Sequence, residues 1–416
     1  MGKRLKVLMS AYACEPGKGS EPEVGWQWAL QMARFHDVTV LTRANNQSSI
    51  ARGLAALPDA VPRPKFLFHD AGPWLLKLKK VFHATQLYYT LWQSAAQAHI
   101  AARLAREPVD LLHHVTFAGF RFPTAVWRHG VPCVWGPVGG AESIPAALLP
   151  WRHPRSLAGE LFRNLSNGFQ FSPLSSLRRR ARASTVLLAS THEMQRALSQ
   201  RGFPAHLMPT IGLQTRNLTA RPPDSRPADA PLRLLYVGNL IALKGLDLAL
   251  EALRASQANA TFTVIGEGRL GPSLQQLTQK LGLAARVAFA GRRPHPEVLR
   301  TYAQFDLLLF PSLHDTGGYA VIEAMASGLP VVCLDSGGPA LAVRDNCGIK
   351  VPLGPRHEVV AGLGRAVRLY DENRALLAEH GRQARERVLE FYEWDRKGEE
   401  MNRFYQEAVG AVRQAA

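Results

Sequence analysis

The chain has 416 residues, of which 46% are hydrophobic and 20% are charged, and its formal net charge is +17. This length favours two domains, because single hydrophobic cores stop growing at roughly 250 to 300 residues, and the hydrophobic content excludes a disordered polyelectrolyte. The four cysteines (Cys14, Cys133, Cys333 and Cys347) lack the paired spacing in the sequence of a zinc site or a disulfide framework. The sequence contains no run of about 18 apolar residues, so no membrane-spanning helix is expected.

The positive charge is concentrated in the first half of the chain. Residues 1–220 hold 26 Lys and Arg against 11 Asp and Glu, whereas the remainder holds 24 against 22. Such asymmetry indicates a surface that faces an anionic partner, either a membrane leaflet or nucleic acid, and solubility alone is the alternative. Because no nucleic-acid recognition motif accompanies the charge, we favour the membrane.

Short apolar runs alternate with longer amphipathic segments in this half, as in parallel sheets with crossover helices. The first run resembles the start of a secretion signal, but Lys6 interrupts it and indicates a buried strand instead. A helix is expected at residues 21–35. The expected strands lie at residues 5–9, 38–42, 66–68, 111–115, 131–135 and 186–189.

Two basic segments and a pair of histidines stand out among these elements. Residues 73–82 (PWLLKLKKVF) suit either an interfacial helix on anionic lipid or an ordinary core helix, and residues 177–182 add four arginines. His113 and His114 follow Asp110 on an expected strand, so their side chains point to opposite faces and only one can face a cleft. A cleft-facing histidine could bond a sugar or a leaving phosphate, and a buried histidine bonded to backbone is the alternative.

A proline-rich segment divides the chain. Residues 221–231 (RPPDSRPADAP) carry four prolines and no hydrophobic run, which indicates a linker. A helix at residues 246–255 and a last helical region from Arg356, interrupted at residues 391–394, follow it. Further strands are expected at residues 234–237, 262–265, 287–289, 307–310 and 331–334. The sequence therefore predicts an α/β protein whose parts are residues 1–220, the linker 221–231, residues 232–392 and a C-terminal segment 393–416.

Residues 315–338 form the clearest local constellation of the sequence. They follow an expected buried strand, place Asp315 and Glu323 eight positions apart, and end with a glycine pair. Loops at the carboxyl ends of parallel strands form ligand crevices, where amides at Gly317 and Gly318 could approach phosphate or sugar oxygens. Glu323 could accept hydrogen bonds from a ribose diol. Glycines that only make turns, beside solvated acids, are the alternative.

This segment resembles the signature of family 4 glycosyltransferases of the GT-B fold: an acid, seven residues, Glu, then Ala-Met-Ala-x-Gly-x-Pro-Val-Val and a glycine pair. Other regions agree in order and spacing, namely residues 19–29, 110–116, 236–245, 264–270 and 289–298. The resemblance implies two Rossmann-like domains facing each other across a cleft. The first would bind the acceptor, the second the nucleotide sugar, and the C-terminal helix would cross back to the first. It also implies a retaining reaction without a metal or other cofactor.

The resemblance assigns roles to three side chains near the expected nucleotide site. Lys244 resembles the lysine that grips the donor diphosphate, a role that a charge-assisted hydrogen bond suits. Glu323 resembles the residue that holds the ribose. Asp315 stands where the family usually has Glu in contact with donor-sugar hydroxyls, so its reach is one methylene shorter.

Other positions extend the resemblance to the phosphates and the base. Gly19 and Ser20 resemble the glycine-rich loop after the first strand, where a helix N-terminus faces the phosphates. Arg292 resembles the position whose backbone recognises the base. Asn239 stands where the family usually has an arginine that completes a two-cation clamp. Another cation, such as Arg269 or Arg292, or backbone amides would then replace that arginine.

We therefore predict a cytoplasmic glycosyltransferase, peripheral on the inner face of the membrane. It would move a hexose-type sugar from a UDP-sugar or GDP-mannose to a hydroxyl of a lipid-linked or polysaccharide acceptor. Lys244, Asp315 and one of His113 and His114, which lie near the family's active-site histidine, are the expected catalytic residues. No metal and no nucleic acid are expected. A nucleotide-sugar epimerase or hydrolase of the same fold and a non-catalytic basic protein that binds membranes or nucleic acid are the alternatives.

Overall fold

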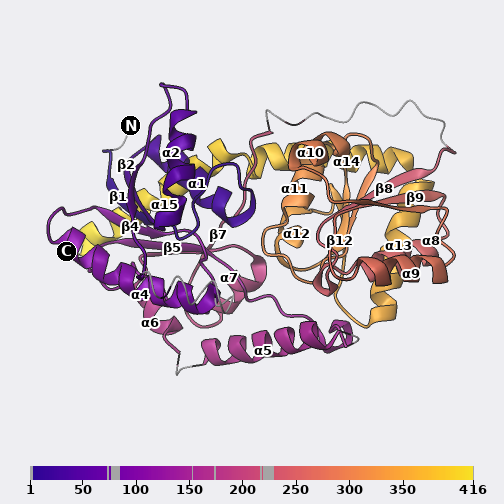
Figure 1. Cartoon of the computed structure of the whole chain (residues 1–416), viewed down its shortest axis with the longest axis horizontal. Helices are drawn as coiled ribbons and strands as arrows, with labels where there is room; N and C mark the ends of the chain where they lie inside the picture. The colour runs from indigo at the N-terminus through magenta and orange to yellow at the C-terminus, as the bar shows by residue number, and fades with distance from the viewer. Residues whose placement is uncertain are drawn as a thin grey trace. The chain divides into compact units, whose positions relative to one another are not determined.

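The computed structural model describes residues 3–72, 75, 85–151, 153–172, 175–215, 218 and 229–415, which form two compact units (Figure 1). The first unit contains Met1–Ala141, Ser166–Gly212 and Trp394–Ala416, and the second contains Glu142–Leu165 and Leu213–Glu393. The expected lysine-rich helix at 73–82 lies outside the described residues apart from Leu75, as does the linker apart from its last three positions.

The first unit contains a seven-stranded parallel sheet in the order β3-β2-β1-β4-β5-β6-β7. Its strands are β1 Lys6–Ser10, β2 Asp37–Thr42, β3 Lys65–Phe68, β4 Leu111–His114, β5 Cys133–Val138, β6 Val186–Ala189 and β7 His206–Leu207. The central strands β4, β5 and β6 are buried along their whole length, as expected where helices cover both faces of a parallel sheet. The six strands predicted for this half are confirmed, and β7 is an additional edge strand.

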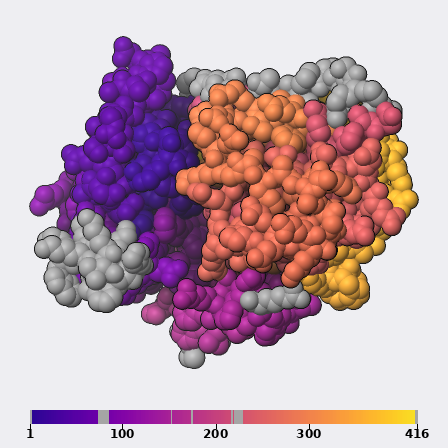
Figure 2. Space-filling model, turned by 45° about the vertical axis from the view of Figure 1, so that its right-hand side comes forward, coloured from indigo at the N-terminus to yellow at the C-terminus, as the bar shows by residue number. Residues whose placement is uncertain are grey.

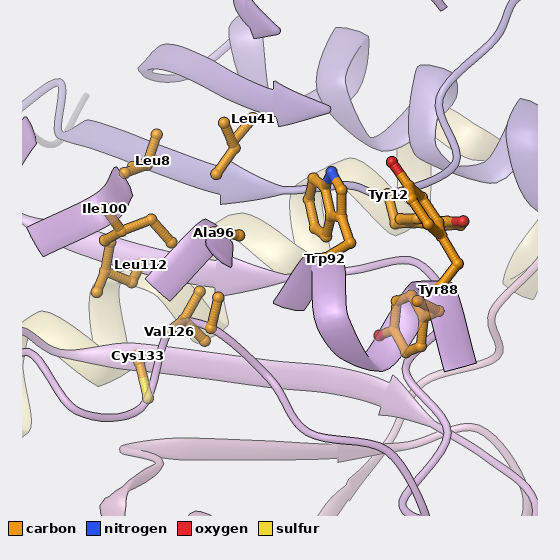
Figure 3. Packing of buried hydrophobic residues seen from close by; sticks show 12 residues of the cluster. Leu8, Tyr12, Leu41, Tyr88, Trp92, Ala96, Ile100, Leu112, Val126 and Cys133 are labelled. Atoms are coloured by element: carbon orange, nitrogen blue, oxygen red, sulfur yellow. The ribbon is translucent and has the colours of Figure 1, made fainter. Parts of the chain in front are cut away.

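Helices cover this sheet and supply much of its core. They are α1 Ser20–Ala33, η1 Ala44–Asn46, α2 Gln47–Ala55, α4 Thr85–Leu104, α6 Leu177–Ala183, α7 His192–Ser199 and α15 Trp394–Ala415, while α5 Pro154–Phe171 has residues in both units. Figure 3 shows α4 inserting Trp92 and Tyr88 beside Leu41 and Tyr12. The Trp92 and Tyr12 rings meet edge to face at 5.2 Å, an arrangement that aromatic pairs favour.

The last helix belongs to the first unit although it follows the second in sequence. α15 packs against α1 and against β4, β5 and β6. The rings of Trp28 and Trp394 lie 5.1 Å apart at nearly right angles, and the Tyr405 hydroxyl lies 2.7 Å from Nδ1 of His113. The core of the first unit is thus closed by residues from the far end of the sequence.

The unit boundaries differ from the predicted first domain, residues 1–220, at one segment. Residues 142–165 group with the second unit. One reason is polar contact: Arg163 on α5 lies 2.5 Å from Nδ1 of His314 and is also paired with Glu160, and Arg269 donates a hydrogen bond to Ser156. Such contacts between distant segments have no local sequence signal.

The basic segment at residues 177–182 is only partly at the surface. Arg180 is buried, and its guanidinium donates hydrogen bonds to the carbonyls of Phe120 and Phe122 and lies over the Trp135 ring at 5.1 Å. Burial lowers the pKa of Arg180 to about 10. One of the four arginines therefore supports the core rather than a binding surface.

The second unit contains a six-stranded parallel sheet in the order β10-β9-β8-β11-β12-β13. Its strands are β8 Leu232–Val237, β9 Ala260–Ile265, β10 Val287–Gly291, β11 Leu307–Phe310, β12 Val331–Leu334 and β13 Gly348–Val351. Its helices are η2 Ala146–Leu148, η4 Ala242–Lys244, α8 Leu246–Ser256, α9 Gly271–Lys280, α10 His295–Tyr302, α11 Tyr319–Ala326, α12 Gly337–Ala342, α13 Arg356–Glu372 and α14 Arg374–Phe391. The five predicted strands are confirmed, so each unit is a Rossmann-like α/β layer structure.

Candidate functional site

Three neighbouring strands of the second unit end at the same edge of its sheet. Lys244 closes the short helix η4 after β8, Asp315 follows β11, and Gly337 begins α12 after β12. The carboxyl ends of parallel strands lie at one edge of the sheet. The loops that follow β8, β11 and β12 therefore lie next to one another at that edge. Lys244 and Asp315, which were predicted to bind the donor diphosphate and sugar, therefore lie together in this unit, whereas Gly19 and Ser20 belong to the first unit.

Lys244 and Asp315 form an ion pair. Nζ of Lys244 lies 2.5 Å from Oδ2 of Asp315, and each side chain is 19% exposed. The ammonium also lies 5.6 Å from the centre of the Phe310 ring. A partly buried cation held in this way keeps further N–H donors for a ligand, so the geometry suits an anion placed at the edge of the sheet.

The amides of the Asp315 loop are used within the protein. Oδ1 of Asp315 accepts hydrogen bonds from the backbone N–H groups of Gly317 and Gly318, at 3.2 and 2.8 Å, and the carbonyl of Asp315 accepts one from Gly338 at 2.8 Å. A Cβ at Gly337 would lie 2.4 Å from that carbonyl oxygen. The glycine pair therefore allows close contact between two loops, and Asp315 itself organises the loop whose amides were expected to face a ligand.

Glu323 is buried on α11 and held by two residues of α10 that the sequence analysis missed. Its Oε2 accepts a hydrogen bond from the Tyr302 hydroxyl at 2.9 Å, and its Oε1 lies 2.8 Å from Nε2 of His295. Burial, followed by the nearby carboxylate, raises the pKa of Tyr302. His295 and Tyr302 are two helical turns apart and so share one face of α10, a spacing that could have linked them to a common partner.

The cations considered as replacements for the arginine missing at Asn239 have other partners. Asn239 is exposed in the loop after β8. Arg292 lies 3.6 Å from Glu267 in an exposed ion pair, and Arg269 donates to Ser156. The structure instead brings Arg163 against His314, the residue before Asp315. Sequence reasoning missed Arg163 because it comes from α5, about 150 positions away.

Gly19 and Ser20 lie in the first unit, at the start of α1. Their φ angles are +67° and +52°, and a Cβ at Gly19 would meet nothing within 4 Å. The next residue, Glu21, accepts a hydrogen bond from the backbone N–H of Phe117 at 2.6 Å, and burial raises the pKa of its carboxyl. The strained loop is thus anchored at the carboxyl edge of the first sheet, and its contact with a donor stays a prediction.

His113 and His114 are both buried, and both nitrogens of each ring have protein partners. Nε2 of His113 donates to the Gly136 carbonyl at 2.8 Å, so Nδ1 accepts from the Tyr405 hydroxyl. Thr124 Oγ1 lies 2.8 Å from Nδ1 of His114, whose Nε2 lies 3.3 Å from the Tyr89 hydroxyl. The two rings point to opposite faces, as expected, but neither presents a nitrogen to a ligand. This geometry favours the structural alternative.

The buried histidines should make the protein less stable in mild acid. Burial lowers the pKa of His113 to about 4 and that of His114 to about 3. Below about pH 6.5 the unfolded chain binds protons that the folded chain excludes, so each histidine should lower the free energy of unfolding by about 1.4 kcal/mol per pH unit until its folded pKa is reached. Urea unfolding at neutral pH and near pH 5 measures this slope. A His113→Gln variant should have a shallower slope, and equal slopes would contradict the prediction.

One cavity in the first unit is not at a strand's carboxyl end. It has a volume of about 310 Å³ and is lined at the start of β1, β2 and β3 by residues that include Lys6, Asp37 and Lys65. Ligands of open parallel sheets bind at the opposite edge.

Among the described residues, no group of three or more His, Cys, Asp and Glu side chains is arranged to hold a metal ion, and no helix is long and apolar enough to cross a membrane.

Comparison with known proteins bears on the unit that holds Lys244, Asp315 and Glu323. Residues 220–384 match the family of glycosyl transferases group 1. The chain thus carries a glycosyltransferase domain that includes all of β8 to β13. The glycogen synthase of Mycobacterium tuberculosis is 34% identical over 172 residues, 41% of each chain. The D-inositol 3-phosphate glycosyltransferase of Nocardia farcinica is 35% identical over 142 residues, 30% of this chain and 32% of that one. The matched segments therefore span about two fifths or less of these relatives.

Several solved structures have a similar fold over nearly the whole chain. Sucrose-phosphate synthase from Thermosynechococcus elongatus has a TM-score of 0.64 at 18% identity and covers 98% of this chain and 100% of its own. HepE of Anabaena, in complex with UDP and glucose, has a TM-score of 0.58 at 16% identity, with 97% and 100% covered. The predicted fold class, α/β with two parallel-sheet Rossmann-like domains of the GT-B type, is confirmed.

Proposed function

We propose that the protein is a retaining glycosyltransferase of family 4 that transfers a hexose-type sugar from a nucleotide diphosphate donor to a hydroxyl acceptor. The observation that carries the proposal is the joint presence of Lys244, paired with Asp315, and Glu323, held by Tyr302, in a glycosyltransferase group 1 domain. A cation beside the diphosphate and a buried carboxylate acceptor for the ribose are the groups that a nucleotide sugar requires.

In this proposal the second unit holds the donor and the first holds the acceptor. Lys244 stabilises the charge that develops on the leaving nucleoside diphosphate, because a charge-assisted bond strengthens as that charge grows. Asp315 orients the sugar, and no metal ion is required. The acceptor hydroxyl attacks from the face that the phosphate leaves, and the departing phosphate takes its proton. Because the ring nitrogens of His113 and His114 have protein partners, we assign the proton transfer to the departing phosphate and not to a histidine.

The comparison with HepE supports the donor class that we propose, and the charge of the first unit supports the acceptor class. HepE is described with UDP and glucose, which supports a UDP-sugar, and GDP-mannose is the other donor that we propose. The first unit holds 26 Lys and Arg against 13 Asp and Glu, which supports a lipid-linked or polysaccharide acceptor at an anionic membrane. We therefore propose a cytoplasmic protein, peripheral on the inner face of the membrane.

A thermal-shift panel of UDP- and GDP-sugars tests the proposal directly. The correct donor should stabilise the protein by about 2.7 kcal/mol at a hundredfold excess over its dissociation constant. If no nucleotide sugar or nucleoside diphosphate raises the Tm, the non-catalytic alternative is favoured. Incubation of the donor without acceptor separates the remaining alternative, since rapid conversion would indicate an epimerase or hydrolase.

A further inference from the structure

The helix α5 carries an exposed apolar surface. Five of the nine exposed large hydrophobic side chains in the described part of the chain lie on it or just before it. They are Trp151, Leu161, Phe162, Leu165 and Phe169, which are 60%, 48%, 73%, 74% and 55% exposed. Residues 162, 165 and 169 follow helical spacing and share one face. Figure 2 shows part of this helix, magenta at the lower edge, at the surface.

The opposite face of α5 is polar and buried, which fixes the direction in which the apolar face points. Glu160 and Asn167 are buried, and Arg163 pairs with Glu160 and lies against His314. Asn167 donates to the Gly140 carbonyl at 3.3 Å. A surface helix of a water-soluble protein normally buries its apolar stripe and exposes its polar one. α5 does the reverse, so its outer face suits an apolar medium.

The exposed charged side chains of segment 142–182 are of one sign. Arg155 on α5 and Arg179 and Arg182 on α6 are exposed. The acidic residues of segment 142–182 are Glu142 and Glu160, and both are buried. Arg155 precedes Phe162 by seven residues and so lies on the apolar face of α5. Aromatic and aliphatic side chains beside an arginine match the interface of an anionic bilayer, where apolar groups enter the acyl boundary and cations meet lipid phosphates. A second copy of the chain fits less well, because this segment exposes arginines and no acidic side chain, and two like-charged segments would repel each other.

We propose that α5 is the segment by which this protein docks on an anionic membrane surface. Phe162, Leu165 and Phe169 enter the acyl boundary, and Arg155 binds a headgroup phosphate. The proposal places the membrane contact on a helix that the charge pattern alone did not single out. It rests on the membrane location in the proposed function, on the exposed face of α5 and on Arg155, and it is independent of the donor chemistry.

Sedimentation of the full-length protein with vesicles tests this inference. Wild-type protein should bind vesicles of phosphatidylcholine and phosphatidylglycerol in equal parts more strongly than vesicles of phosphatidylcholine alone. The double variant Phe162→Ser, Leu165→Ser should bind the anionic vesicles at least about tenfold more weakly, since two large apolar groups no longer enter the bilayer. The matched control is Leu369→Ser, Leu389→Ser, which changes side chains that are 43% and 41% exposed on α13 and α14. It should bind as the wild type does.

Two results would overturn the inference. One is equal vesicle binding by the wild type and the α5 variant. The other is a wild-type dimer in light scattering that the α5 variant converts to a monomer without any vesicle binding, which would assign the face to a second copy. Calorimetric binding of nucleoside diphosphate should be the same in wild type and both variants. If the wild type does not bind nucleoside diphosphate, the proposed function is contradicted, whereas the vesicle result still tests the docking proposal.

Discussion

Lys244→Ala is expected to weaken nucleoside diphosphate binding by about ten- to hundredfold, because one charge-assisted hydrogen bond is worth about 1.5 to 3 kcal/mol. The effect on turnover should be larger, about a hundred- to a thousandfold, as for other groups that stabilise charge developing in the transition state. Titration calorimetry with UDP and GDP measures the first effect. The second follows from kcat with the donor identified by the thermal-shift panel.

Lys280→Ala is the matched control, since Lys280 is an exposed lysine at the end of α9 in the same unit. It should change neither affinity nor kcat. Glu323→Ala should also weaken nucleoside diphosphate binding, because it removes the carboxylate that we propose holds the ribose. Tyr302 and His295 keep that carboxylate in place. Unchanged affinity in both Lys244→Ala and Glu323→Ala would contradict the donor site as we assign it.

Gly337→Ala is expected to disrupt the donor site from the opposite loop. The residue has a φ of +65°, and a Cβ would lie 2.4 Å from the backbone carbonyl oxygen of Asp315. Backbone cannot rotate away as a side chain can, so the loop that carries Asp315 must move. We expect a loss of about 3 to 5 kcal/mol in the free energy of unfolding, the range of severe backbone and packing defects, and loss of donor binding.

Gly282→Ala separates the clash from the φ angle. Gly282 has nearly the same φ, +68°, but a Cβ there would meet nothing within 4 Å. This control should cost only the left-handed penalty of about 1 to 2 kcal/mol and leave donor binding unchanged. Urea unfolding and calorimetry on both variants make the comparison. Equal losses of stability in the two variants would show that close contact at Gly337 has no effect of its own.

The central strands of both sheets were predictable because they are buried on both faces and read as continuous apolar runs. β6, β11 and β12 begin and end at the predicted residues. The two strands without a prediction, β7 and β13, lie at sheet edges. β7 has only two residues, and β13 contains Gly348 and Lys350, so neither forms an apolar run. Backbone pairing with a neighbour decides such strands, and the local sequence does not encode it.

The site was predictable where short motifs carry it and not where tertiary packing does. Lys244, Asp315 and Glu323 come from local patterns, and the structure brings the first two into contact. The ring of His113 is held by a hydroxyl 292 positions away in the sequence, a contact that no local pattern indicates. The same limit applies to Arg163 beside His314.

The place of α15 in the first unit has a consequence for the order of synthesis. Residues 1–141 and 166–212 of this unit leave the ribosome long before residue 394, yet the Trp28 ring and Nδ1 of His113 contact Trp394 and Tyr405. The second unit, by contrast, has its whole sheet between residues 232 and 351. Folding during translation therefore has to leave the part of the first sheet that α15 covers, at β4, β5 and β6, exposed while the second unit forms. The first unit thus cannot be cut out as one continuous piece of chain.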